Sequence, residues 1–168
     1  MLKKILFTFL SLLILYSCGV VAYRLFEPTA SYHIGNGEDY VDYNSLREYV
    51  TSTGESSIHY FFFYSKTDED SVYIKNSVIT SVENDTSLQF SKIIETVDIT
   101  EITQNMDSNV LYEDWGISSY PAFATFTVEN GNVMVSHILE SSSNHIITAL
   151  DIKQWLKDND LYYDESLQ

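Results

Sequence analysis

Four consecutive residues, Asp68-Glu69-Asp70-Ser71, form the densest group of chemically capable side chains in the sequence. They follow a long apolar run, and Thr67 or Asp68 can serve as the N-cap of a helix whose first turn favours acids. Three adjacent carboxylates also suggest calcium ligands, but the alternating spacing and the glycine of an EF-hand loop are missing. We therefore interpret the group as a capped helix start and expect no metal site.

Ser71 is the one hydroxyl in that group that could act as a nucleophile. It lacks a G-x-S-x-G context, and no histidine is adjacent to it in the sequence. His59 lies in the preceding apolar run, where a structural histidine is expected. The chain has four histidines (His33, His59, His137 and His145), which lack metal-ligand spacing. We expect no catalytic residue, no zinc site and no cofactor.

The second candidate is the loop that ends at Pro121, one of only two prolines in the chain. Proline has no N–H for a sheet ladder, so it belongs at the first residue of a strand or on an edge. An alternating apolar run follows from Ala122, and Ser119 and Tyr120 precede the proline in a polar loop. The sequence leaves open whether the Tyr120–Pro121 bond is cis, the minority state.

Apolar periodicity predicts the order helix, strand, helix, strand, helix, strand, strand, helix. The helices are expected at about 44–52, 68–83, 100–114 and 141–159, and the strands at about 58–64, 91–99, 122–128 and 133–139. Ile58–Tyr64 is continuously apolar, as expected of a central strand covered on both faces. Asn130-Gly131 predicts a type I′ hairpin turn. The composition of residues 27–43 indicates a linker, with a short strand near 31–34.

The segment from Trp115-Gly116-Ile117 to Pro121, with the strand that follows, resembles the cis-proline segment of thioredoxin-fold proteins. The resemblance extends to Phe62–Ser71, where thioredoxins end their first core strand and place Cys-x-x-Cys at the start of the next helix. It covers roughly residues 45–160. It implies an α/β, thioredoxin-like three-layer fold with a mixed central sheet, in which a parallel βαβ unit precedes an antiparallel ββα unit.

The two cysteine positions of that motif are Asp68 and Ser71, so both sulfurs are missing. Disulfide exchange needs a thiolate and a resolving thiol, and the single cysteine, Cys18, lies in the N-terminal hydrophobic segment. The resemblance implies that Ser119, Tyr120 and Pro121 bind an extended peptide by strand addition. The other interpretation is that Pro121 serves fold geometry alone. We expect a non-catalytic, protein- or peptide-binding or accessory module.

Two further functions stay open. Phe63-Tyr64-Ser65-Lys66-Thr67 is similar to small bacterial thioredoxin-like proteins, including bacteriocin transport accessory proteins, which keep Cys-x-x-Cys. This favours, as the alternative, a thiol–disulfide oxidoreductase-family protein that uses a partner's thiols in redox or bacteriocin-export processes. The third is a cation-responsive acidic surface module.

The charge of the chain is strongly acidic. The whole sequence carries −15, and residues 27–168 carry 24 acids against six bases, or −18. Such a field repels nucleic acid and favours cationic partners, although the solubility of an exported domain explains it as well. We therefore expect a protein or peptide partner outside the cytoplasm and no nucleic acid.

The first 26 residues are expected to be a membrane anchor. Lys3-Lys4 precedes an apolar run to Phe26, and about 20 such residues span a bilayer core of about 30 Å. The positive-inside rule then places the following domain outside the cytoplasm. A cleaved signal peptide, or a lipoprotein box with Cys18 lipidated, are the alternatives. The predicted map is an anchor (1–26), a linker (27–43), a thioredoxin-like domain (44–160) and an acidic tail (161–168).

Overall fold

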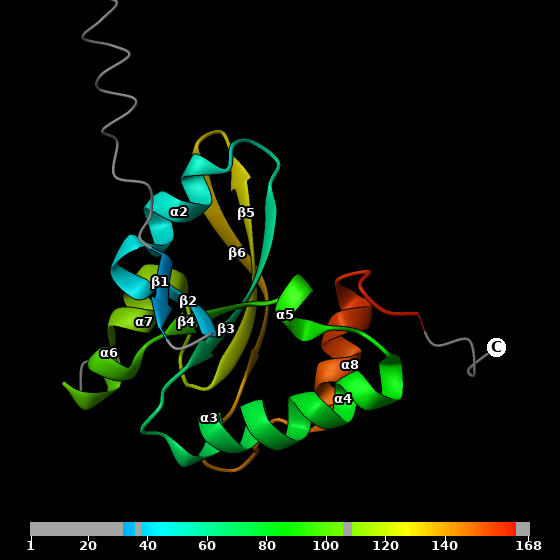
Figure 1. The fold of residues 1–168 in the computed structure, drawn as a ribbon. Helices are drawn as coiled ribbons and strands as arrows, with labels where there is room; N and C mark the ends of the chain where they lie inside the picture. The colour runs from blue at the N-terminus through cyan, green and yellow to red at the C-terminus, as the bar shows by residue number, and fades with distance from the viewer. Residues whose placement is uncertain (1–31, 36–37, 106–108, 164–168) are drawn as a thin grey trace, which may run out of the picture.

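The computed structural model of the protein describes residues 32–35, 38–105 and 109–163, built around a six-stranded mixed sheet of order β1-β2-β4-β3-β5-β6 (Figure 1). The strands are β1 (Tyr32–Gly35), β2 (Glu38–Asp42), β3 (Ile58–Tyr64), β4 (Glu95–Asp98), β5 (Ala122–Glu129) and β6 (Asn132–Glu140). Strands β2, β4 and β3 run parallel, whereas β1–β2, β3–β5 and β5–β6 are antiparallel pairs. A βαβ unit therefore precedes a ββα unit, which confirms the predicted thioredoxin-like arrangement.

Helices cover both faces of the sheet (Figure 1). One face packs against η1 (Tyr43–Ser45), α2 (Leu46–Ser52), α6 (Thr100–Gln104) and α7 (Asn109–Trp115). The other face packs against α3 (Glu69–Tyr73), η2 (Ile74–Ile79), α4 (Thr80–Thr86), α5 (Phe90–Ile93) and α8 (Ala149–Asp158). The result is the three-layer fold that the sequence predicted.

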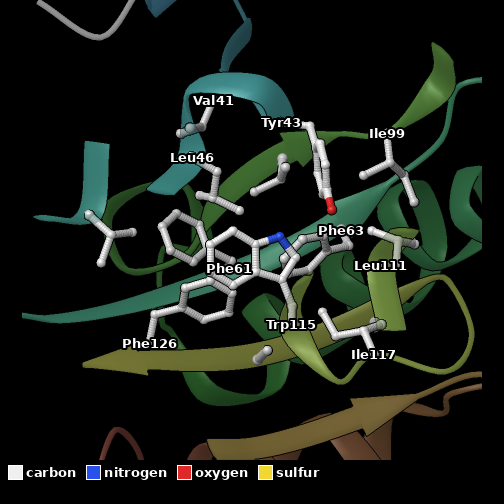
Figure 2. Close-up of a cluster of buried hydrophobic side chains, with 14 of the residues drawn as sticks. Val41, Tyr43, Leu46, Phe61, Phe63, Ile99, Leu111, Trp115, Ile117 and Phe126 are labelled. Carbon is white, nitrogen blue, oxygen red and sulfur yellow. The ribbon is translucent and has the colours of Figure 1, made fainter. Parts of the chain in front are cut away.

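Strand β3 is the centre of both cores. Successive side chains of a strand point to opposite faces, so Phe61 and Phe63 enter the first core and Phe62 and Tyr64 the second. The three phenylalanines are at most 1% exposed. Figure 2 shows the first core, in which Phe61, Phe126 and Trp115 lie together. The continuous apolar run was therefore correctly interpreted as a strand buried on both faces.

The segment 27–43 differs from the predicted linker because β2 lies within it, whereas β1 confirms the short strand expected near residues 31–34. Val41 pairs with Val97 of β4, and both Tyr40 and Val41 are buried. Short strands separated by glycines give a weak local signal, and here pairing with the distant β4 supplies the stabilisation. The domain therefore begins before residue 44.

Three other boundaries differ from prediction. The strand expected at 91–99 is only Glu95–Asp98, because buried Phe90 begins the short helix α5, where its N–H donates to the Glu83 carboxylate at 2.8 Å. The helix expected at 68–83 continues through the π-helical η2 to Thr86. The helix expected at 100–114 is divided into α6 and α7.

The last helix begins later than the Ser141–Asn144 start that the sequence suggested. Ser142 and His145 form an isolated bridge, and α8 begins at Ala149. Thr148 and Asp151 form a capping box: the Asp151 N–H donates to the Thr148 hydroxyl oxygen at 3.3 Å, and the Thr148 N–H donates to the Asp151 carboxylate at 2.8 Å. This reciprocal pair satisfies two N–H groups at the helix start and fixes it there.

Replacement of Thr148 with alanine should lower the free energy of unfolding by about 1 kcal/mol, because the helix loses its N-cap acceptor. Chemical denaturation of the purified full chain measures this loss. Ser143→Ala is the matched control, since Ser143 is exposed and lies before the helix. Equal losses in the two variants would contradict the capping role of Thr148.

The predicted anchor (1–26), with Cys18, and residues 164–168 of the predicted tail lie outside the described residues. Among the helices that are described, none has both the length and the apolar character needed to cross a membrane.

Candidate binding site at the carboxyl ends of the parallel strands

Three loops meet at one end of the sheet. The pairing places Tyr64 beside Asp98 and Phe63 beside Ala122. The segments that follow β3 and β4 therefore lie at the same end as the segment that precedes β5. Both sequence candidates, Asp68–Ser71 and Ser119–Pro121, belong to this end. It is the end at which open α/β sheets bind their ligands.

The Asp68–Ser71 group is a helix start, as predicted. The Asp68 backbone is extended, and its carboxylate accepts a hydrogen bond from the Ser71 N–H at 2.7 Å. Glu69 and Asp70 occupy the first turn of α3. Ser71 is completely buried, and its hydroxyl has no hydrogen-bond partner among the described residues. A substrate in solution cannot reach this hydroxyl without movement of the surrounding chain.

The Pro121 loop is hydrogen-bonded to the end of β6 and to the residue that follows it. The Tyr120–Pro121 bond is cis, and Pro121 is buried. The Pro121 carbonyl accepts from the Ser141 N–H at 2.9 Å, and the Ser119 hydroxyl donates to the Ser141 carbonyl. The Ser118 N–H donates to the Glu140 carboxylate at 2.5 Å. Ser119 is therefore a positioning residue that holds the loop.

Tyr120 has a different environment from its two neighbours. Its side chain is half-buried against the first core. Within the described residues, no hydrogen bond engages its main-chain N–H or carbonyl. Ser119 likewise shows no main-chain hydrogen bond within the described residues, but its hydroxyl holds the loop to Ser141, so Tyr120 is the residue whose main chain and ring both remain for a partner.

Hydroxyl groups connect the loop after β3 to the start of α6. The Lys66 N–H donates to the Thr100 hydroxyl at 2.9 Å, and the Ser65 and Thr103 hydroxyls lie 2.9 Å apart. The Ile99 N–H donates to the Tyr64 carbonyl, also at 2.9 Å. These bonds fix the exits of β3 and β4 relative to each other.

Lys66 and Asp98 form an ion pair at this end. The Lys66 Nζ lies 2.7 Å from Asp98 Oδ2, and Asp98 Oδ1 accepts from the Thr100 N–H at 3.0 Å and the Thr100 hydroxyl at 2.5 Å. Burial alone would raise the pKa of the Asp98 carboxyl, but the hydrogen bonds from Lys66 and Thr100 outweigh it and hold that pKa below its usual value. The hydrogen bond to Asp98 raises the pKa of Lys66.

The pKa of the Asp98 carboxyl is lower in the folded state than in the unfolded state, where it is about 3.9. The ionised carboxylate therefore stabilises the fold at pH values above about 3.9. This stabilisation is lost as the pH falls through the folded-state pKa. The difference in unfolding free energy between wild type and Asp98→Asn should therefore be larger at neutral pH than near pH 3. Denaturation series at several pH values measure this. Glu113→Gln, which removes an exposed carboxylate, should show no such pH-dependent difference.

A pocket of about 390 Å³ opens beside the Lys66–Asp98 pair. Its lining residues are Tyr40, Val41, Asp42, Tyr43, Asn44, Lys66, Asp98, Thr100, Glu101 and Ile102. Sequence reasoning missed this pocket because half of its wall belongs to the segment interpreted as a linker and its continuation. One feature of the sequence could have indicated the pocket: Lys66 follows one strand, β3, and Asp98 ends the neighbouring parallel strand, β4.

No family model matches the chain, and no curated protein matches it. Among solved structures, the chain is similar to a thioredoxin of Plasmodium falciparum, with 15% identity and a TM-score of 0.44 over 76% of this chain and 93% of the other. It is also similar to a thioredoxin of Trichomonas vaginalis, with 11% identity and a TM-score of 0.41 over 71% of this chain and 96% of the other. Similarity at this level assigns no activity to the chain.

Proposed function

We propose that the protein is a membrane-anchored, extracytoplasmic module of thioredoxin-like fold that binds a protein or peptide and does not exchange disulfides. The anchor and the export rest on residues 1–26 of the sequence. The binding role rests on Tyr120, whose main-chain groups have no partner within the described residues and lie in a loop that Ser119 and Pro121 hydrogen-bond to Ser141.

The absence of thiols at the helix start supports a non-catalytic role. Asp68 uses its carboxylate to cap α3, and the Ser71 hydroxyl is buried. Neither group can form the mixed disulfide that exchange requires. Insulin-reduction assays on the purified chain should show no turnover above the reductant alone. Measurable turnover would contradict the non-catalytic role, whereas turnover only after a thiol-bearing partner is added would favour the alternative of an oxidoreductase-family protein that uses a partner's thiols.

An extended partner segment can pair with the free main chain of Tyr120, as in strand addition, while the tyrosine ring supplies contact area. Crosslinking in intact cells identifies candidate partners, and a purified partner then allows its affinity to be measured. Tyr120→Ala should weaken this binding about tenfold, as expected when an aromatic anchor is lost.

The matched control is Tyr112→Ala, because Tyr112 is 62% exposed on α7 and lies outside the Pro121 loop. Hydrogen exchange of the Tyr120 N–H should slow when the partner binds, since strand addition engages this group. Equal affinities for the wild type and Tyr120→Ala, with unchanged exchange at Tyr120, would refute binding at this loop.

A further inference from the structure

The pocket beside Lys66 has walls of two kinds. Apolar surface comes from Tyr40, Val41, Tyr43 and Ile102, whereas polar groups come mainly from the carboxylates and from Lys66. Its volume of about 390 Å³ lies in the range of pockets that hold small ligands, so it has room for one long side chain. A ligand that fits must therefore combine an apolar part with a polar or charged end.

The charged residues of the lining determine whether the polar end of the ligand is a cation or an anion. Three carboxylates, Asp42, Asp98 and Glu101, face one ammonium group, that of Lys66. Lys66 is already paired with Asp98 at 2.7 Å, and the Asp42 carboxylate accepts from the Asn44 N–H at 2.8 Å, so Asp42 and Glu101 keep negative charges that no cation of the lining balances. The net charge of −18 on residues 27–168 adds to this field. An anionic ligand would be repelled, and a cationic one attracted.

The arrangement of the carboxylates does not suit a metal ion. In the ranges that the structure describes, no group of three or more acidic, histidine or cysteine side chains could hold a metal. Carboxylates that do not converge on one point can still surround a larger organic cation, whose charge is spread out or carried on an apolar stem. The apolar part of the wall matches such a stem.

The Tyr40 ring, one part of the pocket wall, already holds the ammonium groups of two lysines, of which Lys66 lines the pocket and Lys75 does not. The Lys66 ammonium lies 4.8 Å from the centre of the Tyr40 ring while it is paired with Asp98. The Lys75 ammonium lies 4.9 Å from the same ring centre and donates to the Tyr40 hydroxyl at 2.7 Å. These are cation–π contacts, and because the protein's own lysines already occupy the Tyr40 ring, a ligand cation is left with the part of the pocket lined by Asp42, Tyr43, Glu101 and Ile102.

We propose that this pocket binds the side chain of a lysine or arginine exposed on a partner polypeptide. Its charged head lies near Asp42 and Glu101, and its stem packs against Tyr43 and Ile102. The pocket is separate from the Pro121 loop, because none of its lining residues comes from the segment before β5. The proposal therefore does not depend on peptide binding at Tyr120.

The test is an NMR titration of the isotope-labelled full chain, kept in neutral detergent, with N-acetyl-arginine amide. Saturable shifts are expected at the amides of Asp42–Asn44 and Asp98–Ile102, and they should weaken at high salt, which screens the charges. N-acetyl-norleucine amide has an uncharged stem and should bind more weakly. N-acetyl-glutamate amide should give no shifts in these segments, and shifts from it there would overturn the proposal.

Two variants with the same change of charge distinguish binding in the pocket from nonspecific attraction by the negative charge of the whole protein. Glu101→Lys should weaken arginine amide binding about tenfold and Glu101→Gln about fivefold, because Glu101 lines the pocket. Glu113→Lys makes the same charge change on α7 outside the lining and should have a smaller effect. Equal weakening by the two lysine variants would show nonspecific attraction and overturn the proposal.

The Tyr120→Ala variant distinguishes this site from the proposed function. It should bind arginine amide as tightly as the wild type, even where it has lost the partner peptide. If Tyr120→Ala abolishes arginine amide binding, the cation binds at the Pro121 loop and the pocket proposal is wrong.

Discussion

Replacement of Phe126 with alanine is expected to lower the free energy of unfolding by about 3–5 kcal/mol. Phe126 is completely buried in the first core. Its ring centre lies 5.0 Å from that of Phe61 in an edge-to-face contact and 4.9 Å from that of Trp115 (Figure 2). The substitution removes these contacts and a third with Phe63, at 6.0 Å, and leaves a cavity between β3, β5 and α7. Chemical denaturation of the full chain measures the loss.

Leu150→Ala is the control for this variant, because Leu150 is 76% exposed. It should change the unfolding free energy by less than about 0.5 kcal/mol. A loss below about 1 kcal/mol in Phe126→Ala would mean that the core collapses around the cavity, contrary to its dense aromatic packing. A loss in the expected range would support the close packing of Phe126 against Phe61 and Trp115.

The sequence predicted those parts of the fold whose signals are local. The run Ile58–Tyr64 identified the central strand because seven consecutive residues fit one strand buried on both faces. Asn130-Gly131 identified the hairpin, and both residues have positive φ values, 53° and 73°. His59 was interpreted as structural, and it bonds to Glu95 at 2.8 Å and to Thr53 at 2.9 Å.

The parts that were missed depend on contacts between distant segments. The strand β2 forms beside β4, and its residues pair with partners such as Val97 for Val41, 56 positions away; nothing in the composition of β2 signals this pairing. The start of α8 was placed too early because Ile146 and Ile147 fit the helical apolar pattern. In the structure, Ile147 is buried before the helix, and Thr148 caps it.

The candidate site likewise has one part that the sequence predicts and one part that it does not. The Pro121 loop could be predicted because its residues are consecutive in the sequence, whereas its cis bond is known only from the structure. The Lys66 pocket could not, because it unites residues from β2, η1, the loop after β3, the end of β4 and α6. Only the sheet order, in which β4 lies between β2 and β3, brings these segments to one place.

Trp155 is expected to be as important to the second core as Phe126 is to the first. It is 4% exposed on α8, and its ring centre lies 5.6 Å from that of Phe123 and 6.0 Å from that of Tyr60. Its indole N–H donates to the carbonyl of His137, a residue of β6 with φ +46°. Trp155→Ala should therefore lower the unfolding free energy by about 3–5 kcal/mol.

Trp155→Phe separates the contribution of ring packing from that of the hydrogen bond to His137, because it keeps an aromatic ring but removes the indole N–H. It should cost about 1–3 kcal/mol, since the His137 carbonyl loses its donor. An equal loss in the two variants would mean that the hydrogen bond, and not ring packing, holds α8 against β6. The end of β6 bonds to the Pro121 loop through Glu140 and Ser141. Trp155→Ala should therefore also speed hydrogen exchange at Ser118, whose N–H donates to Glu140, whereas Thr148→Ala should leave that exchange nearly unchanged.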